Sequence, residues 1–109
     1  MKIGFIGLGN VGGKLAGSLI RNNFDVTVRE IDESLTNEFK KLGAKIAKSP
    51  KELAQKSDLI IIHTEWNDFK SINFKTYIKG KKPIIFDMRN IYSPSKMKKA
   101  KIKYFGIGR

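Results

Sequence analysis

The length of 109 residues and the 40% hydrophobic content suit a single domain, residues 1–109, with a modest core. The chain has no cysteine, which excludes disulfides, thiolate metal sites and a cysteine nucleophile, and its scattered carboxylates and single histidine lack metal-ligand spacing. No apolar run is long enough to span a bilayer, and glycines interrupt the apolar start as they would not in a secretory signal. We therefore expect a cytoplasmic domain with no metal and no membrane partner.

Positive charge is concentrated in the second half of the chain. Of its 22 Lys/Arg and ten Asp/Glu, residues 70–109 hold twelve cations and a single acid, Asp87. Such a segment would suit an anionic partner, such as a nucleotide, another phosphate-rich ligand or nucleic acid. Most of the cations are lysines and isoleucine is also abundant, as AT-rich coding would produce. We therefore favour solvated lysines and rank nucleic acid as a weak candidate.

A glycine-rich loop between a strand and a helix dominates the first thirty residues. The apolar run in 2–7 predicts a buried strand, and helical spacing of apolar residues predicts a helix over 10–22. Between them, Gly7 to Gly12 reads G-x-G-x-x-G. In this context Gly7 permits a tight turn, Gly9 lets a pyrophosphate approach the backbone, and Gly12 allows close helix packing. Asn10 and Val11 open the helix, whose free N–H groups favour phosphates. We predict an NAD-binding site here, against the alternative of glycines that serve packing alone.

An acid follows at the spacing that a ribose ligand requires. A second strand is predicted over 25–30, and it ends at Glu30, whose carboxylate would accept hydrogen bonds from the ribose hydroxyls. Asp32 is the alternative ribose ligand if the strand runs longer. Glu30 could also be a solvated loop acid that binds no ligand. Arg29 could pair with a 2′-phosphate instead, which would favour NADP. In a regular strand Arg29 points to the opposite sheet face, so we favour NAD.

The remaining elements alternate between helix and strand. We predict helices from 32–34 to Gly43, over 50–56 behind a Ser49 cap, within 68–79, and over 94–100, and strands over 44–47, 59–63, 83–86 and 102–105. This alternation predicts a three-layer Rossmann fold, a doubly wound six-stranded parallel sheet in the order 3-2-1-4-5-6. Ligand should bind at the carboxyl ends of the strands, beside the switch between strands one and four.

The end of the fourth strand supplies further cofactor-binding candidates. His63 and Thr64 would lie where a cofactor or substrate sits. His63 could act as an acid or base, but a polar residue that simply finishes a buried strand is favoured. Trp66 could cover a nucleotide ring, although packing beneath the next helix is favoured. We assign no catalytic residue.

Residues 1–62 resemble the N-terminal domain of the β-hydroxyacid dehydrogenases, the group of 3-hydroxyisobutyrate and 6-phosphogluconate dehydrogenases. The resemblance rests on Gly4 to Gly12, on Gly43-Ala44-Lys45 with Ser49 to Leu53, and on Ser57 to Ile61. It implies an NAD-binding domain. In that family the catalytic lysine lies on a following all-helical domain, which has no counterpart in these residues.

Residues 63–109 are similar to the end of the UDP-glucose 6-dehydrogenase family, where the C-terminal domain helps to hold the UDP moiety. The motifs are Thr64 to Phe69, Lys82 to Asn90 and Tyr104 to Arg109. The resemblance implies contact between Arg89 and a UDP-sugar, against a structural ion pair with Asp87. The catalytic cysteine of that family is missing, and so is the Phe-Lys-Pro-like motif whose lysine reaches the ligand. The chain thus resembles a mosaic, in which the N-terminal part is like a cofactor-binding domain and the C-terminal part is like a UDP-binding domain.

These observations order the expected functions. We predict first an NAD(H)-binding Rossmann domain that is related to dehydrogenases and lacks its own catalytic machinery. The alternatives are a UDP-sugar binding domain or subunit of a UDP-glucose 6-dehydrogenase-like enzyme, and nucleic-acid binding through the basic half. Whether the chain forms a homodimer or joins a partner catalytic subunit stays open.

Overall fold

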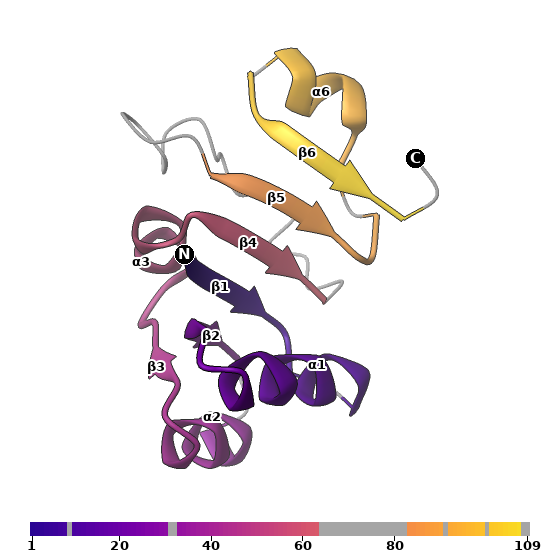
Figure 1. The fold of residues 1–109 in the computed structure, drawn as a ribbon. Coiled ribbons are helices and arrows are strands. Elements are labelled where there is room, and N and C mark those ends of the chain that lie inside the picture. Colours follow the sequence, from indigo (N-terminus) through magenta and orange to yellow (C-terminus); the bar gives the residue numbers. More distant parts are fainter. Residues whose placement is uncertain (9, 31–32, 64–82, 91, 100, 108–109) are drawn as a thin grey trace.

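The structure, a computed structural model, is a parallel sheet between two layers of helices (Figure 1). The strands are β1 (Lys2–Ile6), β2 (Asp25–Arg29), β3 (Lys45–Ile46), β4 (Leu59–Ile62), β5 (Ile84–Asp87) and β6 (Lys103–Gly106). The described helices are α1 (Asn10–Arg21), α2 (Glu33–Lys41), α3 (Pro50–Lys56) and α6 (Pro94–Lys99). The six strands run in the order β3-β2-β1-β4-β5-β6, so the predicted Rossmann topology is confirmed.

The structure describes residues 1–8, 10–30, 33–63, 83–90, 92–99 and 101–107, with residues 10–12 and 50 described by their backbone alone. The predictions for Gly9, Asp32, Thr64 and Trp66, and for a helix within 68–79, lie outside these residues. In this part of the chain no helix is both long and apolar enough to cross a membrane, and no three potential metal ligands come together.

The core consists of two apolar clusters, one on each face of the sheet. On one face α1 and α2 cover β1 and β2, and Phe5, Val28 and Phe39 are among the buried residues. On the other face α3 packs on β1 and β2 and α6 packs on β6, and Leu53, Ile62 and Met97 belong to the buried cluster there. Strands covered on both faces need apolar residues at successive positions, which is the pattern of β1 and β4.

Local signals fix the ends of the helices as the sequence predicts. Ser49 caps α3, since its side chain accepts a hydrogen bond from the backbone N–H of Glu52 at 3.1 Å. Gly43 follows α2 with a φ of 105°, and the N–H of Ala44 donates to the carbonyl of Phe39 at 3.0 Å. This is the arrangement of a Schellman motif, in which a glycine takes the left-handed conformation at the helix end.

Gly4 allows α3 to lie against the centre of the sheet. A Cβ at this position would lie 2.3 Å from the Ser57 Oγ and 2.6 Å from the Leu53 Cδ2. Both neighbours are buried, and the Ser57 hydroxyl also donates to the carbonyl of Leu53. The missing side chain therefore determines how closely α3 packs on β1. In the sequence Gly4 stands out only as part of the family motif, and its packing role was not predicted.

We expect Gly4→Ala to destabilise the fold by about 1–3 kcal/mol, because the new methyl overpacks a site that cannot expand freely. Gly17→Ala in α1 is the matched control. Its Cβ would meet only the flexible end of Arg21, at 3.1 Å, so the gain in helix propensity of about 0.5–1 kcal/mol should prevail. Urea denaturation of both variants tests this pair. Equal stability of Gly4→Ala and wild type would contradict the packing argument.

Candidate dinucleotide site at the carboxyl edge of the sheet

The loop after β1 turns sharply and lies against the end of β2. Gly7 has a φ of 91°, a conformation that favours glycine, and its N–H donates to the carbonyl of Arg29 at 3.1 Å. The chain then enters α1 at Asn10, and the first turn of α1 contains no acidic residue. The N–H groups of a helix start and their partial positive charge can therefore act on an anion at this edge without competition from an acid in the first turn of the helix itself.

Glu30 lies at this loop and is almost completely buried. Its Oε2 accepts a hydrogen bond from the backbone N–H of Leu8 at 2.7 Å, and only 9% of the residue is exposed. The strand β2 ends at Arg29, one residue earlier than predicted, so Glu30 is the first residue beyond the strand. The acid that the sequence assigned to a ribose is thus joined to the glycine-rich loop that it assigned to a pyrophosphate.

Arg29 presents a buried donor at the same edge. Its Nε is inaccessible to solvent and has no hydrogen-bond partner in the described part of the chain. Val28 packs in the cluster under α1 and α2, so strand alternation directs Arg29 to the opposite face of the sheet. Buried donors are rarely left unpaired, so this nitrogen is a candidate contact for a ligand.

His63 lies directly beyond β4, next to the end of β1. Its backbone N–H donates to the carbonyl of Ile6 at 2.8 Å, and the residue is partly exposed. The described part of the chain gives the imidazole no hydrogen-bond or ion-pair partner. A general base is usually oriented by a second group, so this arrangement resembles the predicted polar end of a strand more than an acid–base pair.

Asp87 organises the edge at β5 and is completely buried. Its Oδ1 accepts from the backbone N–H of Arg89 at 3.1 Å, and its Oδ2 accepts from the N–H of Tyr92 at 3.0 Å and the hydroxyl of Tyr104 at 2.7 Å. Asn90, with a φ of 53°, reaches the carbonyl of Ile107 at 3.0 Å. Residues 88–90 are therefore fixed from both β5 and β6. This network was not predicted from the sequence, although an acid at the end of a buried strand before Arg-Asn and a tyrosine on the last strand were its signals.

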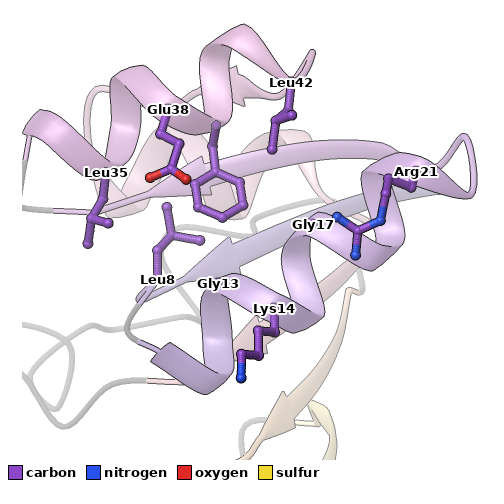
Figure 2. A pocket seen from close by; sticks show the side chains of 9 residues that line it. Leu8, Gly13, Lys14, Gly17, Arg21, Leu35, Glu38 and Leu42 are labelled. Atoms are coloured by element: carbon purple, nitrogen blue, oxygen red, sulfur yellow. The ribbon is translucent and has the colours of Figure 1, made fainter.

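A groove of about 400 Å³ lies between α1 and α2 and is bordered by Leu8 of the glycine-rich loop (Figure 2). Figure 2 shows Glu38 extending from α2 toward Leu8, while Arg21 folds back along α1 toward Gly17. A Cβ on Gly13 would lie 3.0 Å from the Leu8 carbonyl oxygen and 3.5 Å from the Phe39 ring. Gly13 thus lets α1 lie close to the Leu8 carbonyl and to Phe39 of α2. The close packing of helix on strand that the sequence predicts for Gly12 is a separate contact and stays a prediction.

A strand–glycine–helix loop, a carboxylate held against it and a buried arginine Nε that has no hydrogen-bond partner in the described residues fit the needs of a dinucleotide. The comparison with protein families decides the assignment, because residues 2–101 match the NAD binding domain of 6-phosphogluconate dehydrogenase. The chain belongs to this family. NAD is therefore the cofactor of the domain type, and the predicted dinucleotide ligand is supported. The match also crosses the boundary near residue 62 at which the two resemblances of the sequence meet.

Curated relatives come from both groups that the motifs resemble. A probable mitochondrial 3-hydroxyisobutyrate dehydrogenase of Dictyostelium discoideum is 44% identical over 59 residues, which are 54% of this chain and 18% of that protein. A UDP-glucose 6-dehydrogenase of Rickettsia typhi is 37% identical over 91 residues, which cover 79% of this chain and 21% of that protein. The chain thus spans about a fifth of the length of these relatives. The second match is too long to be confined to residues 63–109, so the two resemblances overlap.

Solved structures confirm the fold. An imine reductase variant from Myxococcus stipitatus in complex with NAD+ superposes with a TM-score of 0.81 at 20% identity, over 96% of this chain and 39% of that one. The Myxococcus stipitatus imine reductase in complex with NADP+ gives the same TM-score at 19% identity, over 97% of this chain and 40% of that one. At such identities the likeness shows the Rossmann architecture alone.

We expect Asp87→Asn to lower the free energy of unfolding by about 2–3 kcal/mol, because an amide has one acceptor oxygen and turns its NH₂ toward a buried donor. Tyr104→Phe should cost about 1–3 kcal/mol, since it removes one hydrogen bond to the carboxylate. Asp25→Asn is the control, because the surface pair of Asp25 with Lys45, at 3.2 Å, should contribute less than about 1 kcal/mol. Urea denaturation measures all three, and equal losses at Asp87 and Asp25 would contradict the assigned role.

Proposed function

We propose that the chain binds NAD(H) at the carboxyl edge, with Gly9 at the pyrophosphate and Glu30 at the ribose of the adenosine half. The hydrogen bond between Glu30 and the Leu8 N–H carries this proposal, because it sets the carboxylate and the loop beside one another. Only one carboxylate oxygen takes part in this bond, so the other can accept from a ribose hydroxyl. Gly7, Asn10, Val11 and Gly12 would shape the turn and the helix start around the phosphates.

The cofactor choice follows from the charge of Glu30. A carboxylate accepts hydrogen bonds from two ribose hydroxyls, whereas it repels a 2′-phosphate. Arg29 is the competing determinant, because its unpaired Nε is a donor that a phosphate could use. We propose NAD over NADP, since Arg29 projects to the opposite sheet face from Val28.

Glu30→Gln should lower the affinity for NADH roughly tenfold or more, because hydrogen bonds to a charged group contribute about 1.5–3 kcal/mol. The glutamine oxygen can still accept from the Leu8 N–H, so the loop should be preserved. NADPH should gain relative to NADH, since the repelling charge is removed. Fluorescence titration of the wild type and the variant with both cofactors measures these changes.

Glu33→Gln is the matched control for this experiment. Glu33 is an exposed acid in the first turn of α2, so its neutralisation should leave both affinities unchanged. Tighter binding of NADPH than of NADH by the wild type would reassign the ribose end of the site to Arg29. Equal effects of the two substitutions would show that Glu30 affects binding only through its negative charge and not through a contact with the ribose.

We further propose that the chain supplies the cofactor domain of a dehydrogenase and not the catalytic residues. Bound NAD would provide hydride acceptance, but a substrate hydroxyl must also be held near it and lose a proton to an oriented base. His63 is the candidate base at this edge, and the described part of the chain offers its imidazole no orienting partner. A partner catalytic subunit or a homodimer would be the means of completing such a site. A cytoplasmic location remains part of this proposal.

We expect no steady NAD reduction by the isolated chain with UDP-glucose, 3-hydroxyisobutyrate or 6-phosphogluconate. The absorbance of NADH at high protein concentration is the measurement, and NADH titration of the same preparation confirms that the protein is competent to bind. Turnover that is lost in His63→Ala would overturn this expectation and make His63 the catalytic base. Turnover that survives in His63→Ala would place the base elsewhere in the chain.

UDP-sugar binding is the second candidate function, and the fixed turn at β5 favours it. Asp87 and Asn90 hold residues 88–90 in place, which would present the exposed Arg89 at the carboxyl edge. Arg89 would then contact the UDP-sugar, as the resemblance to UDP-glucose 6-dehydrogenase implies. A titration with UDP-glucose distinguishes the candidates, since Arg89→Ala should abolish this binding and leave NADH binding intact.

A further inference from the structure

The strand β6 forms one end of the sheet, and its outer side faces no other described strand. It is the last strand in the order of the sheet, and Figure 1 shows it outermost, with α6 beside it. An outermost strand can accept a further strand, because its outward N–H and C=O groups can form the same ladder as those that face inward. The outer side of β6 is therefore a candidate surface for an extended peptide.

Two observations give the direction of the backbone groups at Gly106. The N–H of Ile102 donates to a carbonyl of α6 at 3.0 Å and not to β5. Backbone groups alternate along a strand, so those of Gly106 point to the same side as those of Ile102. The ladder on the other side agrees, because the N–H of Met88 donates to β4 and the backbone groups of Asp87 must then face β6. Gly106 pairs in register with Asp87, so its own N–H and C=O point outward.

A groove of about 490 Å³ follows this outer side, between β6 and α6. It is lined by Pro94, Lys98, Lys101, Ile102, Lys103 and Tyr104, and β5 contributes none of these residues. Side chains of consecutive strand residues point to opposite faces of a sheet. A groove that contacts Ile102, Lys103 and Tyr104 therefore lies along the edge of the strand and not on one face of the sheet.

Three of the residues that line the groove are lysines, and none of their side chains has an ion-pair partner in the described part of the chain. Lys98 belongs to α6, Lys101 to the turn that follows and Lys103 to β6, and all three are exposed. Asp87, the only acidic side chain of residues 70–109, is completely buried. An acidic occupant would thus be attracted to the groove, whereas a second copy of β6 would bring lysines against lysines.

We propose that an extended, acidic segment of a partner protein binds along the outer edge of β6 as an added strand of the sheet. Its backbone would pair with the outward groups of Gly106, and carboxylates on the α6 side would lie beside Lys98 and Lys101. Its alternate side chains would lie on the other face beside Phe105, which is 47% exposed, so apolar residues suit those positions. The lysines alone would indicate a solvated surface, and the edge alone would accept any strand; together they select this occupant. This binding does not depend on the dinucleotide site.

The test is fluorescence anisotropy with labelled Glu-Val and Lys-Val repeat peptides of about eight residues, a common strand length. A Glu-Pro repeat of equal length carries the same charge as the Glu-Val repeat but cannot form a ladder, because proline has no N–H. We expect the Glu-Val peptide to bind and the other two to bind at least about fivefold more weakly. Equal binding of the Glu-Pro repeat would overturn the added strand and leave charge alone as the attraction. Equal binding of the Lys-Val repeat would overturn the acidic partner.

Gly106 provides the test of backbone pairing. Gly106→Pro removes the outward N–H and leaves the bonds to β5 in place, so the affinity for the Glu-Val peptide should fall roughly 2- to 10-fold. Gly106→Ala keeps the N–H and is the matched control. Amide hydrogen exchange of the wild type gives the same information without a substitution. The Gly106 amide should exchange fast in the free protein and slowly with saturating peptide, whereas the Phe105 amide, which faces β5, should be protected in both states. Fast exchange at Gly106 in the complex would contradict the proposal.

Charge reversal tests the role of the lysines. Lys98→Glu should lower the affinity for the Glu-Val peptide roughly 2- to 25-fold, because the attraction of an exposed pair is replaced by a repulsion of similar size. Lys40→Glu makes the same change on the exposed side of α2 and should leave the affinity unaltered. Equal losses in the two variants would show a diffuse positive field and overturn the site. Sedimentation of the chain alone is the last check, since a dimer that Gly106→Pro abolishes would assign the edge to a second copy instead.

Discussion

The strand β1 has to be covered on both faces at once, and the rest of the domain depends on how this is achieved. Phe5 is packed under α1 and α2, while Ile6 belongs to the cluster under α3 and α6. Gly4 removes the side chain that would separate α3 from the sheet. Because β1 is central, the chain leaves it for β2 on one side and reaches β4 on the other. The two directions of winding diverge at its carboxyl end, and there the glycine-rich loop lies.

The carboxyl edge combines two kinds of polar group with different functions. The carboxylate of Glu30 accepts a hydrogen bond from the glycine-rich loop through Oε2, so its other oxygen could accept from the ligand that we propose there. The carboxylate of Asp87 accepts three hydrogen bonds and has become part of the core. A buried charge is tolerated when its hydrogen-bonding capacity is used in this way. Burial therefore does not distinguish the acid that we propose for binding from the structural one, whereas the number of hydrogen bonds that each carboxylate accepts differs between them.

Sequence patterns predicted the elements that local rules govern. The Ser49 cap, the Gly43 stop and the alternation of strands and helices depend on residues within a few positions, so the topology and most element limits were predictable. The packing role of Gly4 was not, because Leu53 and Ser57 meet it only after α3 has folded onto the sheet. The Asp87 network likewise joins residues up to 17 positions apart. Contacts between residues so far apart produce no periodic pattern in the sequence. A family resemblance identifies the residues but does not give their physical role.

Among the described helices, none covers the side of β5 and β6 that α1 and α2 cover on β1 and β2, and the winding of the sheet explains this. Crossovers between parallel strands are right-handed, so those that run from β1 to β3 and the one from β5 to β6 place their helices on opposite faces. The helices α1 and α2 therefore cover their face only over the first half of the sheet, and α6 covers the other face of the second half. A solvated strand face would normally carry polar residues. Instead this chain has Phe86 and Phe105 there, beside Lys103, and the single acid of the segment is withdrawn into the core. The topology of the sheet thus explains why α1 and α2 do not reach these residues.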